Sequence, residues 1–364
     1  MKRREIRALT GVRAVAAWWV VIYHLRGLLP QIFPRIAGLI HSLADSGYLG
    51  VDLFFVLSGF VIAYNYWERF AEFDPYEFRR FLWMRLARIY PVHFVALCLT
   101  GVLFLLVRWR HVSIASDLSS WTCATFIQNL LLVHHWMPSA QLSWNAPAWS
   151  ISCEWLAYLA FPALVALLRI NHLGQLHLLV LGLLAVQCAT VQAHCGNDLI
   201  RVSTEFTAGV VLWKIYRAGV PNRFVMAFAG IVCLASLGGH FLGYYADVWL
   251  ILTFPFFVYG LTREGFVSRL LSGRWFLYWG RASYSLYMFH AVAGMLLDKV
   301  LPLSRVISAP FDQRVGTVAV WFAAFGGIAS FCYAFIEVPA RRRMEMMLDK
   351  PKVLLLSLES DPVR

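Results

Sequence analysis

Long apolar stretches recur from one end of this chain to the other, separated by short segments that carry most of the charged residues. A helix needs about 20 mostly apolar residues to cross the hydrocarbon core of a membrane. Ten stretches approach that length, and the sixth and eighth are the least certain: 9–28, 48–66, 89–107, 149–168, 176–193, 200–213, 224–240, 247–261, 277–297 and 315–336. The pattern predicts an all-α, polytopic transmembrane helix bundle of about ten helices.

The composition agrees with a chain whose solvent is lipid. Hydrophobic residues make up 60% of the 364 residues and charged residues only 14%, whereas a soluble domain carries roughly 25% charged residues. We expect one membrane domain over residues 1–340 and a short basic cytosolic tail over 341–364. The net charge of +12 would suggest a nucleic-acid partner in a soluble protein. In a membrane protein the location of basic residues matters more than their sum, so we expect membrane lipids, and no nucleic acid, as partners.

The distribution of lysine and arginine predicts how the chain is oriented. When the N-terminus is placed in the cytosol and the ten helices alternate in direction, 22 basic residues fall on the cytosolic side and 7 on the other. Loops of membrane proteins that face the cytosol carry such an excess. Both termini are therefore predicted to be cytosolic.

Ionisable residues inside the apolar stretches are costly in lipid and mark functional positions or partner pairs. Arg13 and His24 lie eleven residues apart in the first stretch, which places them on one helix face about 16 Å apart. Counting residues inward from the outer side brings Asp52, Glu154 and His290 to the depth of His24. We expect these four groups to line one cavity in the outer half of the membrane.

The ninth stretch carries a polar face of its own. Arg281 lies near its cytosolic end, and Ser283, Tyr287 and His290 follow at intervals of four and three residues, which is one face of a helix. The cavity is expected to continue toward the cytosol past Arg13 and Arg281.

Simpler explanations exist for single residues. A lone intramembrane histidine also serves to pack two helices through a hydrogen bond. Arg201 and Glu205, four residues apart, are expected to form a structural ion pair, and Arg85 and Arg88 also fit the role of cytosolic anchors. The chain has no HExxH, GxSxG or glycine-rich phosphate motif. Its seven cysteines show no zinc-site spacing, so no metal is expected.

Six short sequence segments, taken together in their order along the chain, are more informative than any one of them alone. They are the spacing from Arg13 to His24, GVDLFFVLSGF at 50–60, RLARIYP at 85–91, WSISCEWLAY at 149–158, GRASYSLYMFH at 280–290 and FIEVPARR at 335–342. Together they resemble acyltransferase family 3, whose membrane-embedded members O-acylate exopolysaccharide, lipopolysaccharide, peptidoglycan, Nod factors and some small molecules. The resemblance covers nearly the whole chain.

The resemblance implies roles for residues that match the family pattern. Arg13 and His24 would be essential, Arg85 and Arg88 would form a cytosolic arginine motif, and Glu154 would be an essential acidic residue. Many members carry a second acidic residue directly after this position, where the present chain has Trp155. A carboxylate pair would then require Asp52.

The resemblance also implies an acyl-CoA donor, most commonly acetyl-CoA, bound as a co-substrate. Its phosphates would be held by cytosolic guanidinium groups, since arginine binds phosphate through several hydrogen bonds: Arg13, Arg85, Arg88 and Arg281. His24 would act as the general base on the acceptor hydroxyl, oriented by Glu154 or Asp52. The developing oxyanion would accept a hydrogen bond from His290 or Tyr287.

The acceptor implied by the family is an extracytoplasmic glycan or a lipid-linked sugar. The enzyme would lie in the bacterial cytoplasmic (inner) membrane as a multi-pass protein, with the polysaccharide biosynthesis machinery as its partner. Two other readings remain open. Buried ionisable residues across ten helices also suit a proton-coupled secondary transporter of a polar or anionic solute, and a non-catalytic scaffold in polysaccharide export is a third alternative.

Overall fold

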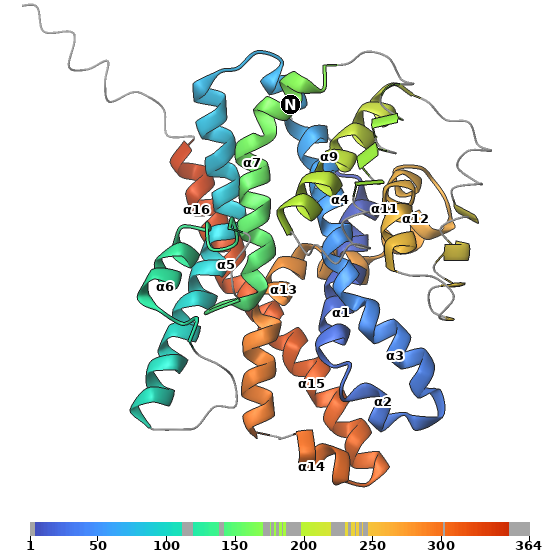
Figure 1. The fold of residues 1–364 in the computed structure, drawn as a ribbon, viewed down its shortest axis with the longest axis vertical. Helices are drawn as coiled ribbons and strands as arrows, with labels where there is room; N and C mark the ends of the chain where they lie inside the picture. The colour runs from blue at the N-terminus through green and yellow to red at the C-terminus, as the bar shows by residue number, and fades with distance from the viewer. Residues whose placement is uncertain are drawn as a thin grey trace, which may run out of the picture.

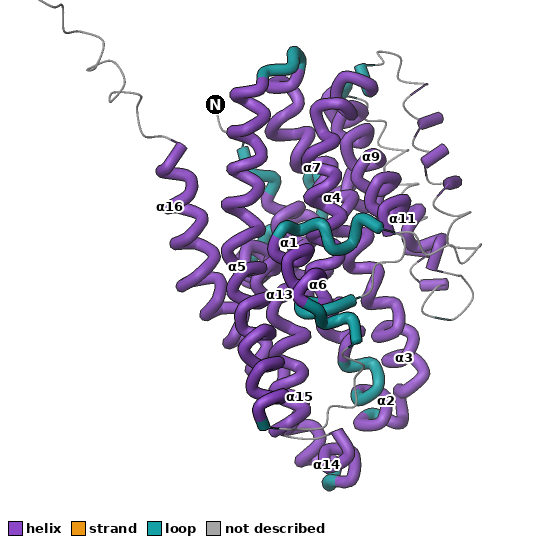
Figure 2. Tube along the Cα trace, turned by 60° about the vertical axis from the view of Figure 1, so that its left-hand side comes forward, coloured by secondary structure: helices purple, strands orange, loops and turns teal. Residues whose placement is uncertain are grey.

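The computed structural model describes residues 4–110, 119–137, 142–169, 198–219, 247–300 and 303–348, together with short stretches between 175 and 242. Every regular element in this part of the chain is helical (Figures 1 and 2). The helices are α1 Arg7–His24, α2 Leu29–Ile32, α3 Ala37–Asp45, α4 Gly50–Tyr66, α5 Pro75–Trp109, α6 Cys123–Leu130, α7 Trp149–Leu167, α9 Asp198–Arg217, α11 Asp247–Leu261, α12 Phe266–Leu271, α13 Arg274–Val300, α14 Leu303–Ser308, α15 Phe311–Cys332 and α16 Val338–Leu348.

Eight of the predicted apolar stretches coincide with helices, namely α1, α4, α5, α7, α9, α11, α13 and α15. The stretches at 176–193 and 224–240 lie largely outside the described residues. Four segments of the described chain are helical, long and apolar enough to cross a membrane: Pro34–Phe70, Pro75–Trp109, Ala146–Leu167 and Phe311–Leu348. The all-α prediction is confirmed for the described residues. The count of about ten helices and the cytosolic location of both termini stay predictions.

The outer face of the bundle is apolar where it meets its surroundings. On α5, Leu105 is 65% exposed and Val102 is 53% exposed, and on the α15 side Phe331 is 58% exposed. Contiguous apolar surface of this kind is rare on soluble monomers and is found where a protein contacts lipid or a partner. Together with the apolar helices, it identifies the chain as a membrane protein.

Helix α5, which contains the third predicted apolar stretch at 89–107, begins much earlier than that pattern predicted. The sequence placed residues 67–88 in a loop, but α5 already begins at Pro75. Asp74 caps this helix by accepting a hydrogen bond from the Tyr76 backbone N–H at 2.9 Å, and proline is favoured at the first helical position. Arg85 and Arg88 are therefore held on a helix rather than in a loop.

Two helix pairs form the centre of the bundle, and both rely on glycine for close approach. A Cβ on Gly59 of α4 would lie 2.0 Å from the Phe206 carbonyl oxygen of α9, and one on Gly280 of α13 would lie 1.9 Å from the Thr10 carbonyl oxygen of α1. Small residues let helix backbones pack closely where lipid provides no hydrophobic drive. The α1–α13 pair runs through the middle of the molecule (Figure 1).

The chain from α15 into α16 is one long helical segment interrupted by a π-helical turn, Tyr333–Glu337. π-Helical turns are rare in proteins, and many of those that occur lie at functional sites. The turn brings Glu337, 1% exposed, against the bundle. Beyond it, α16 packs along α5, where the Trp83 indole donates to the Met344 carbonyl oxygen at 2.8 Å.

Candidate active site

A cavity of about 260 Å³ lies where α1, α5 and α16 meet, and it is lined by arginines from all three helices. We call it the arginine cavity. Its four guanidinium groups belong to Arg13, Arg85, Arg88 and Arg341, and its acidic members are Glu154 and Glu345. Arginines outnumber carboxylates here, so the cavity suits an anion that accepts several hydrogen bonds.

The two arginines of α5, Arg85 and Arg88, are held by partners on other segments of the chain. Arg88 forms an ion pair with Glu337, whose other carboxylate oxygen accepts a hydrogen bond from Ser285 at 2.7 Å. Arg85 donates to the Tyr66 hydroxyl at 2.8 Å and lies over that ring, 4.9 Å from its centroid. These contacts orient both guanidinium groups while leaving further donor positions for a ligand, because each guanidinium carries five N–H groups.

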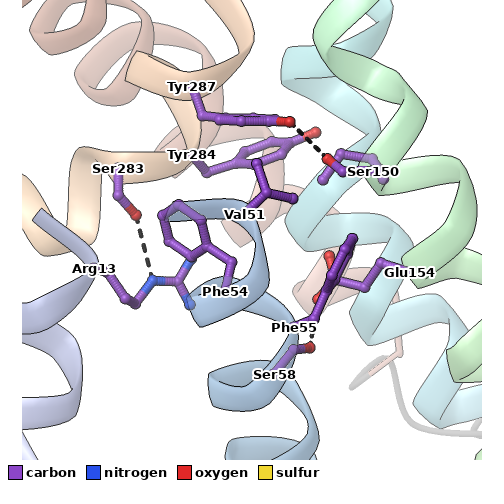
Figure 3. A pocket seen from close by; sticks show the side chains of 11 residues that line it. Arg13, Val51, Phe54, Phe55, Ser58, Ser150, Glu154, Ser283, Tyr284 and Tyr287 are labelled. Atoms are coloured by element: carbon purple, nitrogen blue, oxygen red, sulfur yellow. Dashed lines mark hydrogen bonds between the residues drawn. The ribbon is translucent and has the colours of Figure 1, made fainter. Parts of the chain in front are cut away.

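A second, smaller cavity of about 60 Å³ adjoins the first toward the centre of the bundle (Figure 3). We call it the central cavity. Four side chains line both cavities, which therefore share a wall: Arg13, Ser58, Glu154 and Tyr284. The Arg13 Nε–H donates to the Ser283 hydroxyl at 3.3 Å (Figure 3). Arg13 thus lies at the junction between the two spaces.

The opposite wall of the central cavity is formed by α7 and α13. Glu154 accepts a hydrogen bond from Ser58, and the Tyr287 hydroxyl pairs with the Ser150 hydroxyl at 2.8 Å (Figure 3). Tyr287 is also the link to the next group along α13. Its backbone carbonyl lies 2.5 Å from the His290 Nδ1.

His24 and His290 form a pair, with ring centroids 4.5 Å apart. A carbonyl oxygen only accepts hydrogen bonds, so the His290 Nδ1 carries the proton that it donates to Tyr287, and Nε2 of the neutral ring is an acceptor. That Nε2 is buried and has no hydrogen-bond partner within the described chain. His24 is exposed and lines, with His290, a third cavity of about 380 Å³, which we call the histidine cavity.

The prediction that these four ionisable groups line one cavity is therefore wrong. His24 and His290 line one space, Glu154 lines two others, and Asp52 lines none of the three. The sequence counted depth along each helix but carried no information about rotation of the helices relative to one another. The group beside His24 is a second histidine rather than a carboxylate.

Asp52 is fully buried and binds Arg201, with both carboxylate oxygens contacting the guanidinium, one of them at 2.7 Å. Sequence reasoning gave Arg201 the partner Glu205. Glu205 instead shares a hydrogen bond with Asp52. Arg201 also reaches Asp198 at 3.8 Å, and Asp198 accepts from His135 at 2.7 Å. This network connects α4, α9 and the chain before α7.

Arg281 does not lie with the other arginines. Its guanidinium pairs with Glu5 at 3.1 Å on the surface, and both side chains are about half exposed. It follows Gly280, at the close contact with α1, and it points away from the cavities because that face of α13 is turned outward. The prediction that it lines the cytosolic part of the cavity is wrong.

Sequence reasoning also missed Arg341, which lines the arginine cavity, and Glu337, which pairs with Arg88 beside it. Both belong to the segment FIEVPARR, which was recognised only as part of a pattern. The signal that was present is the acidic residue at the end of an apolar stretch, which requires a partner in the membrane. Arg88 is that partner.

Residues 6–337 match a family of known sequences described as an acyltransferase domain, which covers nearly all of the chain. The chain belongs to this acyltransferase family. The match confirms the family inferred from the six segments, and it accounts for polar cavities inside an apolar bundle. No solved structure matches the chain.

Named members of the acyltransferase family are similar over long stretches. Acyltransferase MdmB of Streptomyces mycarofaciens is 30% identical over 262 residues, 65% of each chain. The putative O-acetyltransferase SACOL0978 of Staphylococcus aureus is 24% identical over 94% of this chain and 58% of its own length. The peptidoglycan O-acetyltransferase OatA of Listeria monocytogenes is 24% identical over 93% of this chain and 56% of its own. The chain thus spans less than two thirds of the length of these relatives.

Proposed function

We propose that this acyltransferase moves an acetyl group from cytosolic acetyl-CoA to a hydroxyl of an extracytoplasmic glycan, as a multi-pass protein of the bacterial cytoplasmic membrane. Relatives named as O-acetyltransferases, one of them a peptidoglycan O-acetyltransferase, support the reaction and the acceptor class. The proposal depends most on one observation. Arg13 of the arginine cavity and His24 of the histidine pair lie on the same helix, α1, eleven residues apart.

The arginine cavity supports binding of the donor. Coenzyme A is polyanionic through its phosphates, and guanidinium groups bind phosphate oxygens with charge-assisted, often paired hydrogen bonds. Four arginines from three helices line one space of about 260 Å³. Two of them are already oriented by Glu337 and Tyr66, which lowers the entropy that is lost when a ligand binds.

The central cavity offers the path along which the thioester would extend. It shares Arg13 with the arginine cavity, and Tyr287 on its far wall leads through its carbonyl oxygen to His290. Arg13 and His24 are separated by about 16 Å along α1, from the helical rise of about 1.5 Å per residue. That is a distance the extended arm of an acyl-CoA can span.

The chemistry assigned to His24 is general-base catalysis. A neutral imidazole accepts the proton of the acceptor hydroxyl while the oxygen forms a bond to the thioester carbonyl carbon. The C–S bond then breaks, and the imidazolium returns its proton to the departing thiolate. His290 lies against His24 and would hold its ring. The Tyr287 hydroxyl, placed by Ser150, is the better oxyanion donor, because neutral His290 already gives its one N–H to a carbonyl.

Two measurements test the proposed function. Purified protein in lipid nanodiscs should bind acetyl-CoA, and deletion of the gene should remove acetyl esters from the surface glycans of the producing cells, as seen by mass spectrometry. A protein that binds no acyl-CoA but takes up a solute together with protons would instead be a transporter. Glycans with unchanged ester content would exclude the glycan acceptor.

A further inference from the structure

The histidine cavity is formed by the end of α1 with the residues after it, by α13 and by α15. Its walls are mostly apolar, and the largest side chains are Leu25, Leu28, Met295, Trp321 and Phe325. Among the residues whose side chains the structure describes, no carboxylate, amide or guanidinium group lines it. At about 380 Å³ it is larger than the arginine and central cavities.

Two of the buried polar atoms that lack a hydrogen-bond partner in the described structure belong to residues of this cavity. The His290 Nε2 and the Trp321 Nε1 both belong to residues that line it, and both are buried without a hydrogen-bond partner in the described structure. The two residues are only 3% and 5% exposed. Buried polar atoms almost always have partners, and exceptions call for an explanation such as a missing ligand. His290 offers an acceptor at Nε2 and Trp321 a donor at Nε1, so both can be satisfied by the hydroxyl groups of one polar head, while the reacting hydroxyl directs its single proton to His24.

We infer that the histidine cavity is the acceptor site and that it takes an amphiphilic acceptor, in which the reacting hydroxyl is attached to a largely apolar body. The inference rests on the proposed function and narrows its acceptor class. The hydroxyl occupies the polar corner made by His24, His290 and Trp321. The apolar body lies against the leucine, methionine and phenylalanine side chains.

The chemistry of the walls argues against a free oligosaccharide in this space. Each sugar ring carries several hydroxyl groups, and each hydroxyl that loses water without gaining a hydrogen-bond partner makes binding less favourable. In the described part of the walls, polar side-chain atoms occur only at His24, His290 and Trp321. An apolar body, by contrast, moves from lipid into such walls at little cost, because lipid tails are as apolar as leucine.

The location also argues against the acyl tail of the donor as the occupant. The histidine cavity shares no lining residue with the arginine or central cavities. A donor anchored at the arginines would have to reach the histidine pair past Tyr287, whose carbonyl oxygen contacts His290. The two substrates then meet at His24 and His290 from opposite directions.

Glycines provide a matched pair of variants. A Cβ on Gly294 of α13 meets no atom within 4 Å, and Gly294 lines the histidine cavity. Gly294→Leu would therefore fill the cavity without a backbone clash. Gly327 of α15 is equally unobstructed but does not line the cavity, so Gly327→Leu is the control for a bulkier helix surface.

The experiment uses the full chain in nanodiscs and an octyl glucoside that carries a photoreactive diazirine at the end of its alkyl chain. Labelling that is competed by unlabelled octyl glucoside, but not by methyl glucoside, should map to the segments around 291–295 and 321–325. Gly294→Leu should reduce it at least about tenfold, because the leucine side chain takes the space of the alkyl chain and overpacking a filled cavity is unfavourable. Gly327→Leu should match the wild type.

Transfer from acetyl-CoA to octyl and methyl glucosides gives the second readout. The wild type should favour the octyl compound, and Gly294→Leu should lose that preference while Gly327→Leu keeps it. Labelling that is not competed, or that falls equally in both variants, would overturn the inference. A Gly294→Leu protein that changes its preference among acyl-CoA chain lengths instead would show that the cavity holds the acyl tail. If the wild-type protein does not bind acetyl-CoA, that result would contradict the proposed function rather than this inference.

Discussion

At the scale of single residues, the contrast between paired and unpaired polar groups is informative. Arg88 is bound to Glu337 and Asp52 to Arg201, each deep in an apolar bundle. An unpaired charge at such a depth would be expensive. The His290 Nε2, by contrast, has no partner in the described chain and lies beside exposed His24. The inferred acceptor would supply the partner that this nitrogen lacks.

We predict that His24→Ala abolishes acyl transfer and leaves the fold intact. His24 ends α1 and is exposed, so its removal leaves no buried partner unsatisfied. Loss of a general base lowers turnover by about 10²–10⁴-fold. The measurement is transfer from radiolabelled acetyl-CoA at equal protein level, with acetyl-CoA binding retained. His41→Ala, at an exposed histidine on α3 that pairs with Asp45, is the control. Activity of His24→Ala within a few-fold of that control would remove His24 from the mechanism.

For Arg88 we predict a defect in use of the donor. Arg88→Ala should raise the KM for acetyl-CoA more than the KM for the acceptor, and Arg88→Lys should recover it only in part, because lysine lacks the planar fork. Removing the arginine also leaves Glu337 buried and unpaired. The double variant Arg88→Ala/Glu337→Gln separates donor binding from stability. A double variant with a normal donor KM would exclude Arg88 from the phosphate site.

The ionisable residues that line the cavities could be predicted largely from the sequence, but their partners could not. Arg13, His24, Glu154 and His290 were identified because ionisable side chains are rare in apolar helices. Asp52 was placed among them for the same reason, yet it binds Arg201. Contacts between helices depend on how each helix is rotated about its axis, and one sequence does not contain that information.

At the scale of elements, hydrophobic patterning predicted most helices but not where α5 begins. Apolar runs identify the part of a helix that lies in lipid, whereas α5 extends back to Pro75 through a charged, capped stretch. The same extension places Arg85 and Arg88 on a rigid element against α16. The π-helical turn carrying Glu337 has no signature in the hydrophobic pattern.

The α4–α9 contact carries a testable stability prediction. Asp52→Asn removes the carboxylate that binds Arg201 most closely and leaves it only the more distant Asp198, which should destabilise the protein by up to about 3–5 kcal/mol. Asp45→Asn removes an exposed ion pair with Arg26, whose atoms lie 3.9 Å apart, and should cost less than about 1 kcal/mol. Thermal unfolding of both variants in the same detergent gives the comparison. Equal melting temperatures would show that the Asp52–Arg201 pair does not hold the two helices together.

At the scale of the whole molecule, the arginine cavity and the histidine cavity lie toward opposite ends of the bundle. The N-terminus and α16 lie toward the upper end of Figure 1, and α2, α3 and α14 lie at the lower end. The arginine cavity involves α16, and the histidine cavity lies near the α1–α2 connection. The excess of basic residues predicts that the arginine end faces the cytosol. The family could be recognised from the sequence, but the separation into three cavities required the structure.

The central claim is that the donor is used from the cytosolic, arginine-lined end. Acetyl-CoA does not cross membranes, so membrane vesicles of known orientation test this directly. Radiolabelled acetyl-CoA is added outside inverted and right-side-out vesicles that contain the protein and octyl glucoside, and the acetylated product is counted. We predict transfer in intact inverted vesicles, and in right-side-out vesicles only after permeabilisation. Transfer in intact right-side-out vesicles, or none in either preparation after permeabilisation, would contradict the account.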